Sequence, residues 1–293
     1  MQILGAGCAC WGADEYKECE NKMSWLLWLV IAVGVAYIGC GVYMMIMESR
    51  LLYHPTRQLT TTPAHHRLHF ENVALVAADG VRLHGWFVPA PNALHVVLVC
   101  HGNSGNVGDI VDTLPVLREA GMSVLAFDYR GYGRSEGFPT EQGTYEDALA
   151  AWKYLTLQRG YKSDQIVIYG RSLGAAVATW LATQVSPRAL VFESGFKALP
   201  ELAQELYPWL PVRYLASIRY NNEQRMRDVT CPTLFIHSSD DELIPIDHAR
   251  RVYAVHRGPK QFIEIRGTHG NGYQTSGMAY TAPLHNFLRG VAT

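Results

Sequence analysis

The sequence predicts an α/β domain with a mostly parallel sheet flanked by helices, preceded by one membrane-spanning helix. First, residues 24–47 contain no charged side chain. Second, short apolar runs alternate with longer amphipathic stretches over the rest of the chain, which is typical of buried parallel strands joined by helices. Third, the motifs with chemical potential directly follow apolar runs, and sites in parallel sheets collect at the carboxyl ends of strands.

The composition excludes several classes of protein. Of 293 residues, 48% are hydrophobic and only 17% are charged, so an apolar excess must be concentrated somewhere. The 25 basic and 26 acidic side chains nearly cancel, and there is no basic stripe, which argues against a nucleic-acid partner. An aromatic content of 11% argues against disorder, and six cysteines are too few for a disulfide scaffold.

The apolar excess lies in residues 24–47, between Lys22 and Glu48. As a helix this stretch would be about 36 Å long, more than the roughly 30 Å thickness of a bilayer's hydrocarbon core. Trp25 and Trp28 lie towards one end, where interfacial aromatic residues are common. A buried core helix is the alternative, but such helices seldom run this long without a polar face. We therefore expect a single-pass N-terminal anchor.

Residues 1–23 fit neither a signal peptide nor a domain. A signal peptide would combine a positive start, a shorter apolar region and a small-residue cleavage site, whereas this stretch is net negative. Lipid attachment at Cys40 is a further alternative, although Tyr37 is an unusual residue for such a site. Met23 directly precedes the span, which suggests that residues 1–22 are an extension from an upstream start codon.

The charges around the span slightly favour a cytoplasmic C-terminal domain. Lys17 and Lys22 precede the span, whereas Arg50, Arg57 and Arg67 follow it. Positive residues accumulate on the cytoplasmic side of a membrane, so the small excess after the span predicts that side for the domain.

Residues 48–293 are expected to form one domain. Its first two strands, 70–78 and 81–89, alternate in polarity and are joined by Asp79-Gly80, a hairpin signal. Further strands are expected at 95–100, 123–127, 165–169, 189–192, 233–237 and 261–265. Helices are expected at 107–120, 141–158, 173–184, 247–256 and 279–289.

A G-x-S-x-G motif joins the strand at 165–169 to the helix at 173–184. In Gly170-Arg-Ser-Leu-Gly174, a sharp turn would leave no room for a Cβ at either glycine and would expose the Ser172 hydroxyl. The start of a helix also favours developing negative charge. The motif predicts Ser172 as a nucleophile; the alternative is that Ser172 merely caps the helix.

A serine nucleophile needs a base and a third group that orients the base. His269 follows the last expected strand in a glycine-flanked loop, and we expect it to be the base. Asp240 and Asp241 follow the strand before it, and Asp241 is favoured by its position ahead of Glu-Leu-Ile-Pro. Glu193, after an earlier strand, is the alternative acid.

The oxyanion of a tetrahedral intermediate needs two donors. The backbone N–H of Leu173, next to the nucleophile, should be one. The second is expected from Asn103, in the loop His101-Gly-Asn-Ser-Gly-Asn106 that follows the strand at 95–100. His101 itself is expected to fix this loop by hydrogen bonding rather than to act as the base.

These motifs resemble the α/β-hydrolase superfamily over residues 51–288. Further matches are Leu-Leu-Tyr-His-Pro at 51–55, Asp-Gly-Val-Arg-Leu-His-Gly-Trp at 79–86 and Phe-Asp-Tyr-Arg-Gly-Tyr-Gly-Arg-Ser-Glu-Gly at 127–137. Within it, the chain is similar to the membrane-anchored abhydrolase-domain group, which includes protein depalmitoylases, lysophospholipid hydrolases and bacterial esterases. The resemblance implies the α/β-hydrolase fold, with an eight-stranded sheet, and serine hydrolase chemistry. The chain departs from the family where it has His237-Ser238 in place of His-Gly.

Residues 195–228 are too few for a full cap domain, so we expect a short helical lid there. Its aromatic side chains could line an acyl pocket or simply pack on the sheet. Phe196 and Trp209, together with His101 and Arg171, are the candidates to contact substrate.

The sequence as a whole predicts a membrane-anchored serine hydrolase that cleaves carboxylic esters, of small molecules or lipids, through an acyl-enzyme on Ser172. An acyl-protein thioesterase and a serine peptidase of the same fold are alternatives, because both use the same machinery. A catalytically silent binding module is disfavoured because every triad position is filled. No metal or organic cofactor is expected, since no Cys/His cluster has the spacing of zinc ligands.

Overall fold

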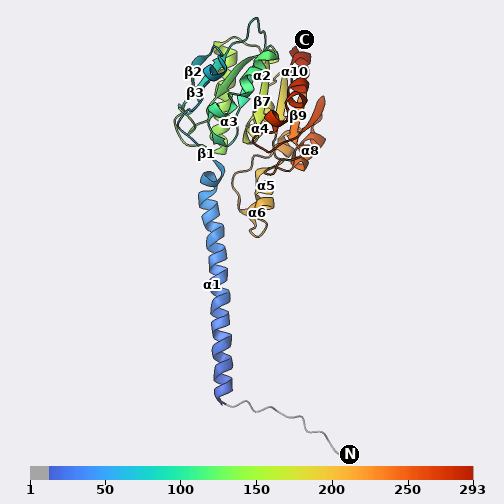
Figure 1. The fold of residues 1–293 in the computed structure, drawn as a ribbon. Helices are drawn as coiled ribbons and strands as arrows, with labels where there is room; N and C mark the ends of the chain where they lie inside the picture. Colours follow the sequence, from blue (N-terminus) through green and yellow to red (C-terminus); the bar gives the residue numbers. More distant parts are fainter. Residues whose placement is uncertain (1–12, 293) are drawn as a thin grey trace, which may run out of the picture. The chain divides into compact units, whose positions relative to one another are not determined.

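A computed structural model describes residues 13–292 of the chain, which divides into two units, residues 1–47 and 48–293 (Figure 1). Residues 1–12 of the predicted N-terminal extension lie outside the described residues.

The first unit contains a single described helix. Helix α1 spans Ala13–Leu52, so it is longer than the predicted 24–47 at both ends, and its last residues belong to the second unit. Lys22 and Glu48 mark the limits of the apolar stretch, but lysine and glutamate are good helix formers and do not end a helix. Within residues 13–292, Ser24–Leu52 is the one helical stretch long and apolar enough to cross a membrane.

The second unit is built on the predicted eight-stranded, mostly parallel sheet, which is confirmed. Its strand order is β10-β9-β8-β7-β4-β6-β3-β2. The strands are β2 (Glu71–Val76), β3 (Arg82–Val88), β4 (Val96–Cys100), β6 (Ser123–Phe127), β7 (Ile166–Arg171), β8 (Ala189–Glu193), β9 (Thr233–Ser238) and β10 (Lys260–Ile265). β3 pairs antiparallel with both β2 and β6, and every other pair of neighbouring strands in this sheet is parallel.

One local feature follows directly from the sequence and a second does not. β2 and β3 form the expected hairpin, and Gly80 takes a φ of +87°, which a residue with a Cβ rarely adopts. A separate two-stranded parallel ladder joins β1 (His54–Pro55) to β5 (Ser104–Gly105), which the apolar pattern did not predict because both strands are only two residues long.

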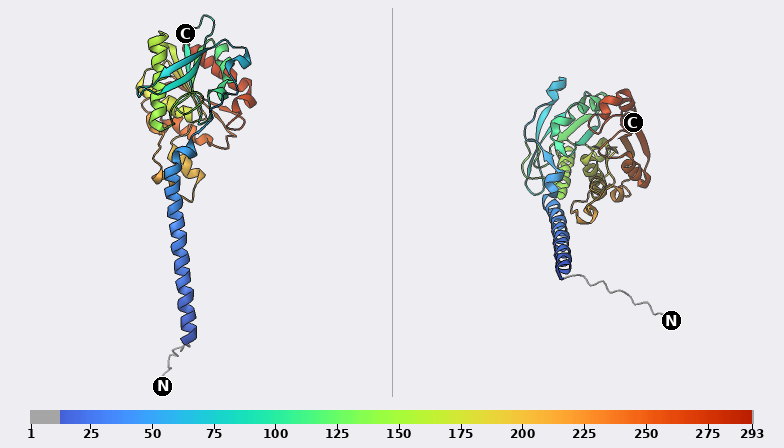
Figure 2. Two further views of the ribbon diagram at one scale, coloured as in Figure 1. Left: turned by 90° about the vertical axis from the view of Figure 1, so that its left-hand side faces the viewer. Right: turned by 60° about the horizontal axis from the view of Figure 1, so that its bottom comes forward.

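Helices cover both faces of the sheet (Figure 2). The main ones are α2 (Thr113–Glu119), α3 (Glu141–Lys153), α4 (Leu173–Gln184), α8 (Ile246–Val255) and α10 (Met278–Ala292). Shorter helical segments are η1 (Pro63–His66), η2 (Val107–Ile110), η3 (Tyr154–Gln158), η4 (Ser163–Gln165) and α9 (Gly272–Ser276). The helix predicted at 107–120 is therefore two pieces, whereas the one predicted at 173–184 has the observed limits.

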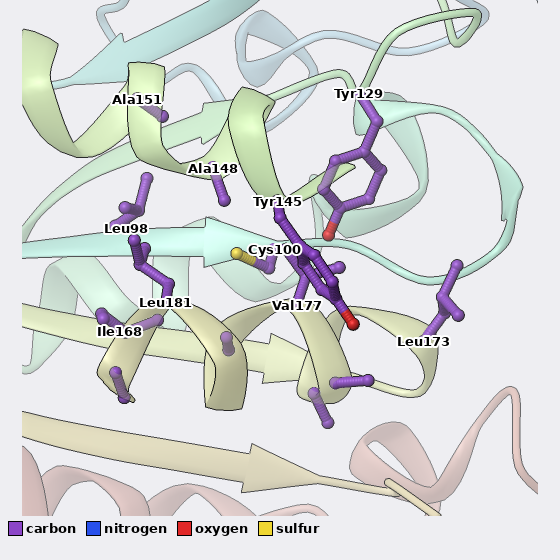
Figure 3. Close-up of a cluster of buried hydrophobic side chains, with 14 of the residues drawn as sticks. Leu98, Cys100, Tyr129, Tyr145, Ala148, Ala151, Ile168, Leu173, Val177 and Leu181 are labelled. Atoms are coloured by element: carbon purple, nitrogen blue, oxygen red, sulfur yellow. The ribbon is translucent and has the colours of Figure 1, made fainter. Parts of the chain in front are cut away.

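The core is divided by the sheet into two apolar clusters. On one face, side chains of α3 and α4 pack on β4 and β7, with Ala148 and Leu181 close to Leu98 and Ile168 (Figure 3). On the other face, α2 and α10 pack on the alternate side chains of the same strands. Because both faces are covered, the central strands read as continuous apolar runs.

Residues 195–228, where a lid is predicted, contain three short helices: α5 (Leu199–Leu206), α6 (Val212–Leu215) and α7 (Asn222–Arg225). Their role as a lid stays a prediction.

Candidate active site

Ser172 occupies a strained turn between β7 and α4. Its φ of 56° and ψ of −120° lie outside the regions that residues with a Cβ normally adopt. A Cβ at Gly170 would lie 2.3 Å from the Gly174 carbonyl oxygen, and one at Gly174 would lie 2.0 Å from the Cys100 carbonyl oxygen. Both positions therefore require glycine, as the motif implies.

The structure brings Ser172, His269 and Asp241 into one hydrogen-bonded chain. The Nε2 atom of His269 lies 2.9 Å from Ser172 Oγ, and its Nδ1 atom lies 2.7 Å from Asp241 Oδ2. These residues follow β7, β10 and β9, so the carboxyl edge of the sheet gathers them. The distances suit proton transfer from a serine hydroxyl to an imidazole that a carboxylate orients.

The electrostatics of Asp241 favour its ionised form. Burial raises the pKa of this carboxyl, but the hydrogen bond and charge of His269 outweigh burial and hold the pKa below its ordinary value. Its other oxygen accepts the backbone N–H groups of Leu243 and Ile244, at 3.0 and 2.8 Å. Because an ionised Asp241 can only accept, Nδ1 of His269 carries the proton and Nε2 is left to accept one from Ser172.

The two alternative acids contact other groups. Asp240 accepts the backbone N–H of Gly267 at 3.2 Å and pairs with Arg266 at 3.2 Å. Glu193 is buried and accepts the hydroxyl of Tyr280 at 2.9 Å and that of Tyr169. The hydrogen bonds of these two carboxylates do not include the His269 ring in the described part of the chain.

The departure at His237-Ser238 has a structural explanation. The Ser238 hydroxyl donates to the Gly267 carbonyl and accepts the N–H of Asp240 at 3.1 Å, so it ties the end of β9 to the loop that carries His269. His237 is fully buried, which holds its pKa below the usual value, and its Nε2–H donates to the Ile244 carbonyl at 2.7 Å. The sequence showed Ser238 only as a departure from the family pattern, and its bond to a loop 29 residues away leaves no local signal.

The loop His101–Asn106 lies against the nucleophile. A Cβ at Gly102 would be 3.6 Å from the Cβ of Ser172. Among the hydrogen bonds of residues 13–292, neither the backbone N–H of Asn103 nor that of Leu173 has a protein acceptor. Both donors are thus free for an oxyanion next to Ser172.

Two further segments hold this loop in place. The Asn103 carbonyl accepts the His54 N–H at 2.9 Å and the Tyr132 hydroxyl at 2.7 Å, while the Asn103 side chain donates to the Leu52 carbonyl at 2.8 Å. The Tyr129 hydroxyl donates to the His101 carbonyl at 3.1 Å. The motifs at 51–55 and 127–137 therefore share a role: both position the loop.

Three of the four residues predicted to contact substrate are hydrogen-bonded to, or packed against, other parts of the domain. The Arg171 guanidinium donates to the carbonyls of His269 and Gly270, at 3.2 and 2.9 Å. His101 is buried, and its Nδ1 bonds the Gly102 carbonyl at 2.8 Å. The Phe196 side chain is buried in the apolar core, where it packs against other core residues instead of lining a substrate pocket. Trp209 is exposed, on the segment between α5 and α6.

No metal centre accompanies these residues: the described residues contain no group of three or more His, Cys, Asp or Glu placed to hold an ion.

Comparison with known proteins gives consistent results. Residues 95–216 match a family model described as the alpha/beta hydrolase fold. An uncharacterized protein of Mycobacterium tuberculosis is 36% identical over 264 residues, covering 88% of this chain and 94% of the relative. The alpha/beta hydrolase domain-containing protein WAV2 of Arabidopsis thaliana is 29% identical, covering 87% and 91%.

A yeast relative from Saccharomyces cerevisiae, named only as an uncharacterized membrane protein, is 30% identical and covers 70% of this chain and 76% of the relative. Among solved structures, an esterase of Pyrococcus furiosus superposes with a TM-score of 0.70 at 21% identity, covering 81% of this chain and 97% of that one. At that identity the likeness concerns the fold.

Proposed function

Because this chain belongs to the α/β-hydrolase fold family, we propose that it is a membrane-anchored serine hydrolase that cleaves carboxylic (acyl) esters through an acyl-enzyme on Ser172. The observation that carries the proposal is the chain of hydrogen bonds from Ser172 through His269 to Asp241, at 2.9 and 2.7 Å.

The first half-reaction acylates the serine. Ser172 Oγ attacks the acyl carbonyl carbon while its proton passes to Nε2 of His269, and Asp241 stabilises the imidazolium. The N–H groups of Leu173 and Asn103 donate to the oxyanion. Collapse of the intermediate breaks the bond to the leaving alkoxide, which takes the proton from His269.

The second half-reaction releases the acid. Water enters, His269 accepts one of its protons, and the resulting hydroxide attacks the acyl carbon of the acyl-enzyme. The same two donors hold the new oxyanion, and Ser172 leaves with the proton from His269. The balance is one ester and one water to one carboxylic acid and one alcohol.

Membrane attachment is proposed through α1. The stretch Ser24–Leu52 has a mean hydropathy of 2.2 in its most apolar window, and only 6% of that window is buried. Apolar side chains exposed over such a length are unstable in water but suited to a bilayer. The membrane-protein name of the yeast relative agrees with this proposal, and the flanking arginines favour a cytoplasmic domain.

The test uses the full chain in detergent micelles, with a fluorophosphonate probe and short p-nitrophenyl esters. Ser172→Ala should lose probe labelling and at least about a thousandfold in ester hydrolysis, since the nucleophile is removed. The matched control is Ser123→Ala, which removes the hydroxyl of another buried serine, at the start of β6. This variant should keep both probe labelling and ester hydrolysis. Undiminished labelling of Ser172→Ala would overturn the assignment.

A further inference from the structure

Large apolar side chains are exposed together at the connection between α5 and α6. Leu206 is 49% exposed, Tyr207 39%, Trp209 58% and Tyr214 80%. We call residues 206–214 the α5–α6 tip. Soluble proteins seldom expose such a group unless something binds it. Elsewhere in residues 48–292 the exposed large apolar side chains, such as Leu94 and Leu157, are far apart in the sequence.

Within the tip itself the single charged side chain is that of Arg213. Between residues 206 and 219 the only ionisable groups with a charge at neutral pH are Arg213 and Arg219. The carboxylate directly before the tip, that of Glu205, is paired with Lys197 and His248. Exposed tryptophan, tyrosine and leucine beside arginine is a composition that suits the headgroup region of a membrane.

The chain that follows the tip is bound to the residue next to the proposed span. The Glu48 carboxylate accepts the backbone N–H groups of Ser217 and Ile218, both at 3.0 Å, and the Ser217 hydroxyl at 2.5 Å. Glu48 directly follows Met47, the last residue of the charge-free stretch. Residues 217–218 are therefore hydrogen-bonded to the residue that directly follows the charge-free stretch.

A second carboxylate fixes the same segment from the domain side. Glu141, at the start of α3, accepts the backbone N–H of Arg219 at 2.7 Å and that of Tyr220 at 2.9 Å. The Tyr220 hydroxyl bonds that of Tyr53 at 2.8 Å. Held on both sides, the segment cannot carry the tip far from Glu48.

The tip is also connected to the nucleophile. The segment that leads into α5 starts at the end of β8, where the Glu193 carbonyl accepts the Ser172 N–H at 2.9 Å. A Cβ at Gly195 would lie 2.8 Å from the Cβ of Ala175, in the first turn of the helix that Ser172 begins. The segment that carries the exposed apolar group thus begins at Glu193, whose carbonyl is hydrogen-bonded to Ser172.

We propose that the α5–α6 tip lies in the headgroup region of the membrane that holds α1, and that the ester cleaved at Ser172 is a lipid acyl ester drawn from that bilayer. The second part rests on the proposed function, whereas the first does not. The hydrogen bonds to Glu48, which directly follows the charge-free stretch, and the exposed aromatic side chains beside Arg213 favour phospholipid over a protein partner as the occupant.

The membrane contact is tested by photo-crosslinking on the full chain in vesicles of phosphatidylcholine and phosphatidylserine. One variant carries p-benzoylphenylalanine in place of Tyr214. The matched control carries it in place of Leu157. Leu157 is 78% exposed and lies in η3, directly after α3. The start of α3 binds Tyr220, so at about 1.5 Å per residue Leu157 lies roughly 20 Å from that point. We expect a lipid adduct by mass at position 214 and little at 157. No adduct at 214, equal adducts at both, or an adduct with protein would overturn the proposal.

The substrate class is tested by comparing a long-chain acyl ester dissolved in the same vesicles with a short water-soluble ester. Tyr214→Glu should lower the rate on the vesicle ester roughly fivefold more than the rate on the short ester, because an anionic surface repels the new charge. Leu157→Glu should change neither rate. Equal loss on both substrates would contradict the proposal. If Ser172→Ala kept its hydrolysis, the proposed function would fail while the crosslink still decided the membrane contact.

Discussion

The guanidinium of Arg171 donates a hydrogen bond of 3.2 Å to the backbone carbonyl of His269, the proposed base, 98 residues away. A second bond, of 2.9 Å, reaches the next carbonyl, that of Gly270. Because Arg171 directly precedes Ser172, the residue beside the nucleophile also holds the loop that carries the base. The buried Glu193 carboxylate lies 3.5 Å from the Arg171 Nε and neutralises its charge.

Arg171→Lys should slow the acylation step, because an ammonium keeps the charge but cannot bridge two carbonyls and face Glu193 as well. Hydrogen bonds to charged groups contribute about 1.5–3 kcal/mol, so kcat should fall roughly tenfold to a hundredfold with little change in KM. Arg250→Lys, which alters only exposed ion pairs, is the control and should match the original chain. A change in KM alone would instead place Arg171 in substrate binding.

Asp241→Asn and Asp240→Asn should differ sharply. Asparagine at 241 can donate to His269 Nδ1 and so favours the wrong tautomer, which predicts a loss in kcat of about 10³–10⁴. Asp240 contacts Gly267 and Arg266 only at the surface, so its variant should stay within a few fold. Steady-state hydrolysis of a short ester measures both. If both variants lost kcat equally and only mildly, Glu193 would be favoured as the acid.

Gly174→Ala should destabilise the domain strongly. Its Cβ would lie 2.0 Å from the Cys100 carbonyl oxygen, so either β4 or α4 must shift. We expect a loss of at least about 2 kcal/mol in the free energy of unfolding, typical of overpacking against backbone. At Gly270, beside the proposed base, nothing lies within 4 Å of an added Cβ. Gly270→Ala should therefore keep its melting temperature, and a comparable drop in both variants would refute the steric argument.

The lowered pKa of Asp241 predicts a component of stability that disappears in acid. A carboxyl with a folded-state pKa below its ordinary value of 3.8 stabilises the fold above that value, and loses this contribution as the pH falls through the folded-state pKa. Asp241→Asn lacks the titration. The difference in urea midpoint between the original chain and Asp241→Asn should be constant from neutral pH to about 5 and should narrow below about 4. A difference that stays constant down to pH 3 would contradict the pKa assignment.

Much of the fold could be predicted because its signals are local. The apolar runs of β4, β6 and β7 and the hairpin at Asp79-Gly80 each depend on fewer than ten neighbouring residues. The positions of Ser172 and its glycines follow in the same way, since the strained turn dictates the residue types.

What the sequence did not reveal depends on contacts between distant residues. Arg171 was one of four candidates to contact substrate, and its hydrogen bond to a loop 98 residues on was not predicted. Phe196 was a candidate to line a pocket, and packing buries it instead. The bond from Ser238 to Gly267 and those from Glu48 to residues 217–218 join single polar residues without a motif, so no pattern could predict them.

The segment from Glu48 to Thr56 has a practical consequence for any form of the protein released into solution. Leu52 and His54 bond the loop that carries the proposed oxyanion donor, Thr56 accepts the side chain of Asn106, and Glu48 binds residues 217–218. A protease that cut just before Glu48 would liberate a domain with these bonds intact. Cleavage ten residues later would remove residues 48–57 and with them all of these hydrogen bonds. The position of the cut would therefore determine whether the released domain keeps the loop that carries the proposed oxyanion donor in place.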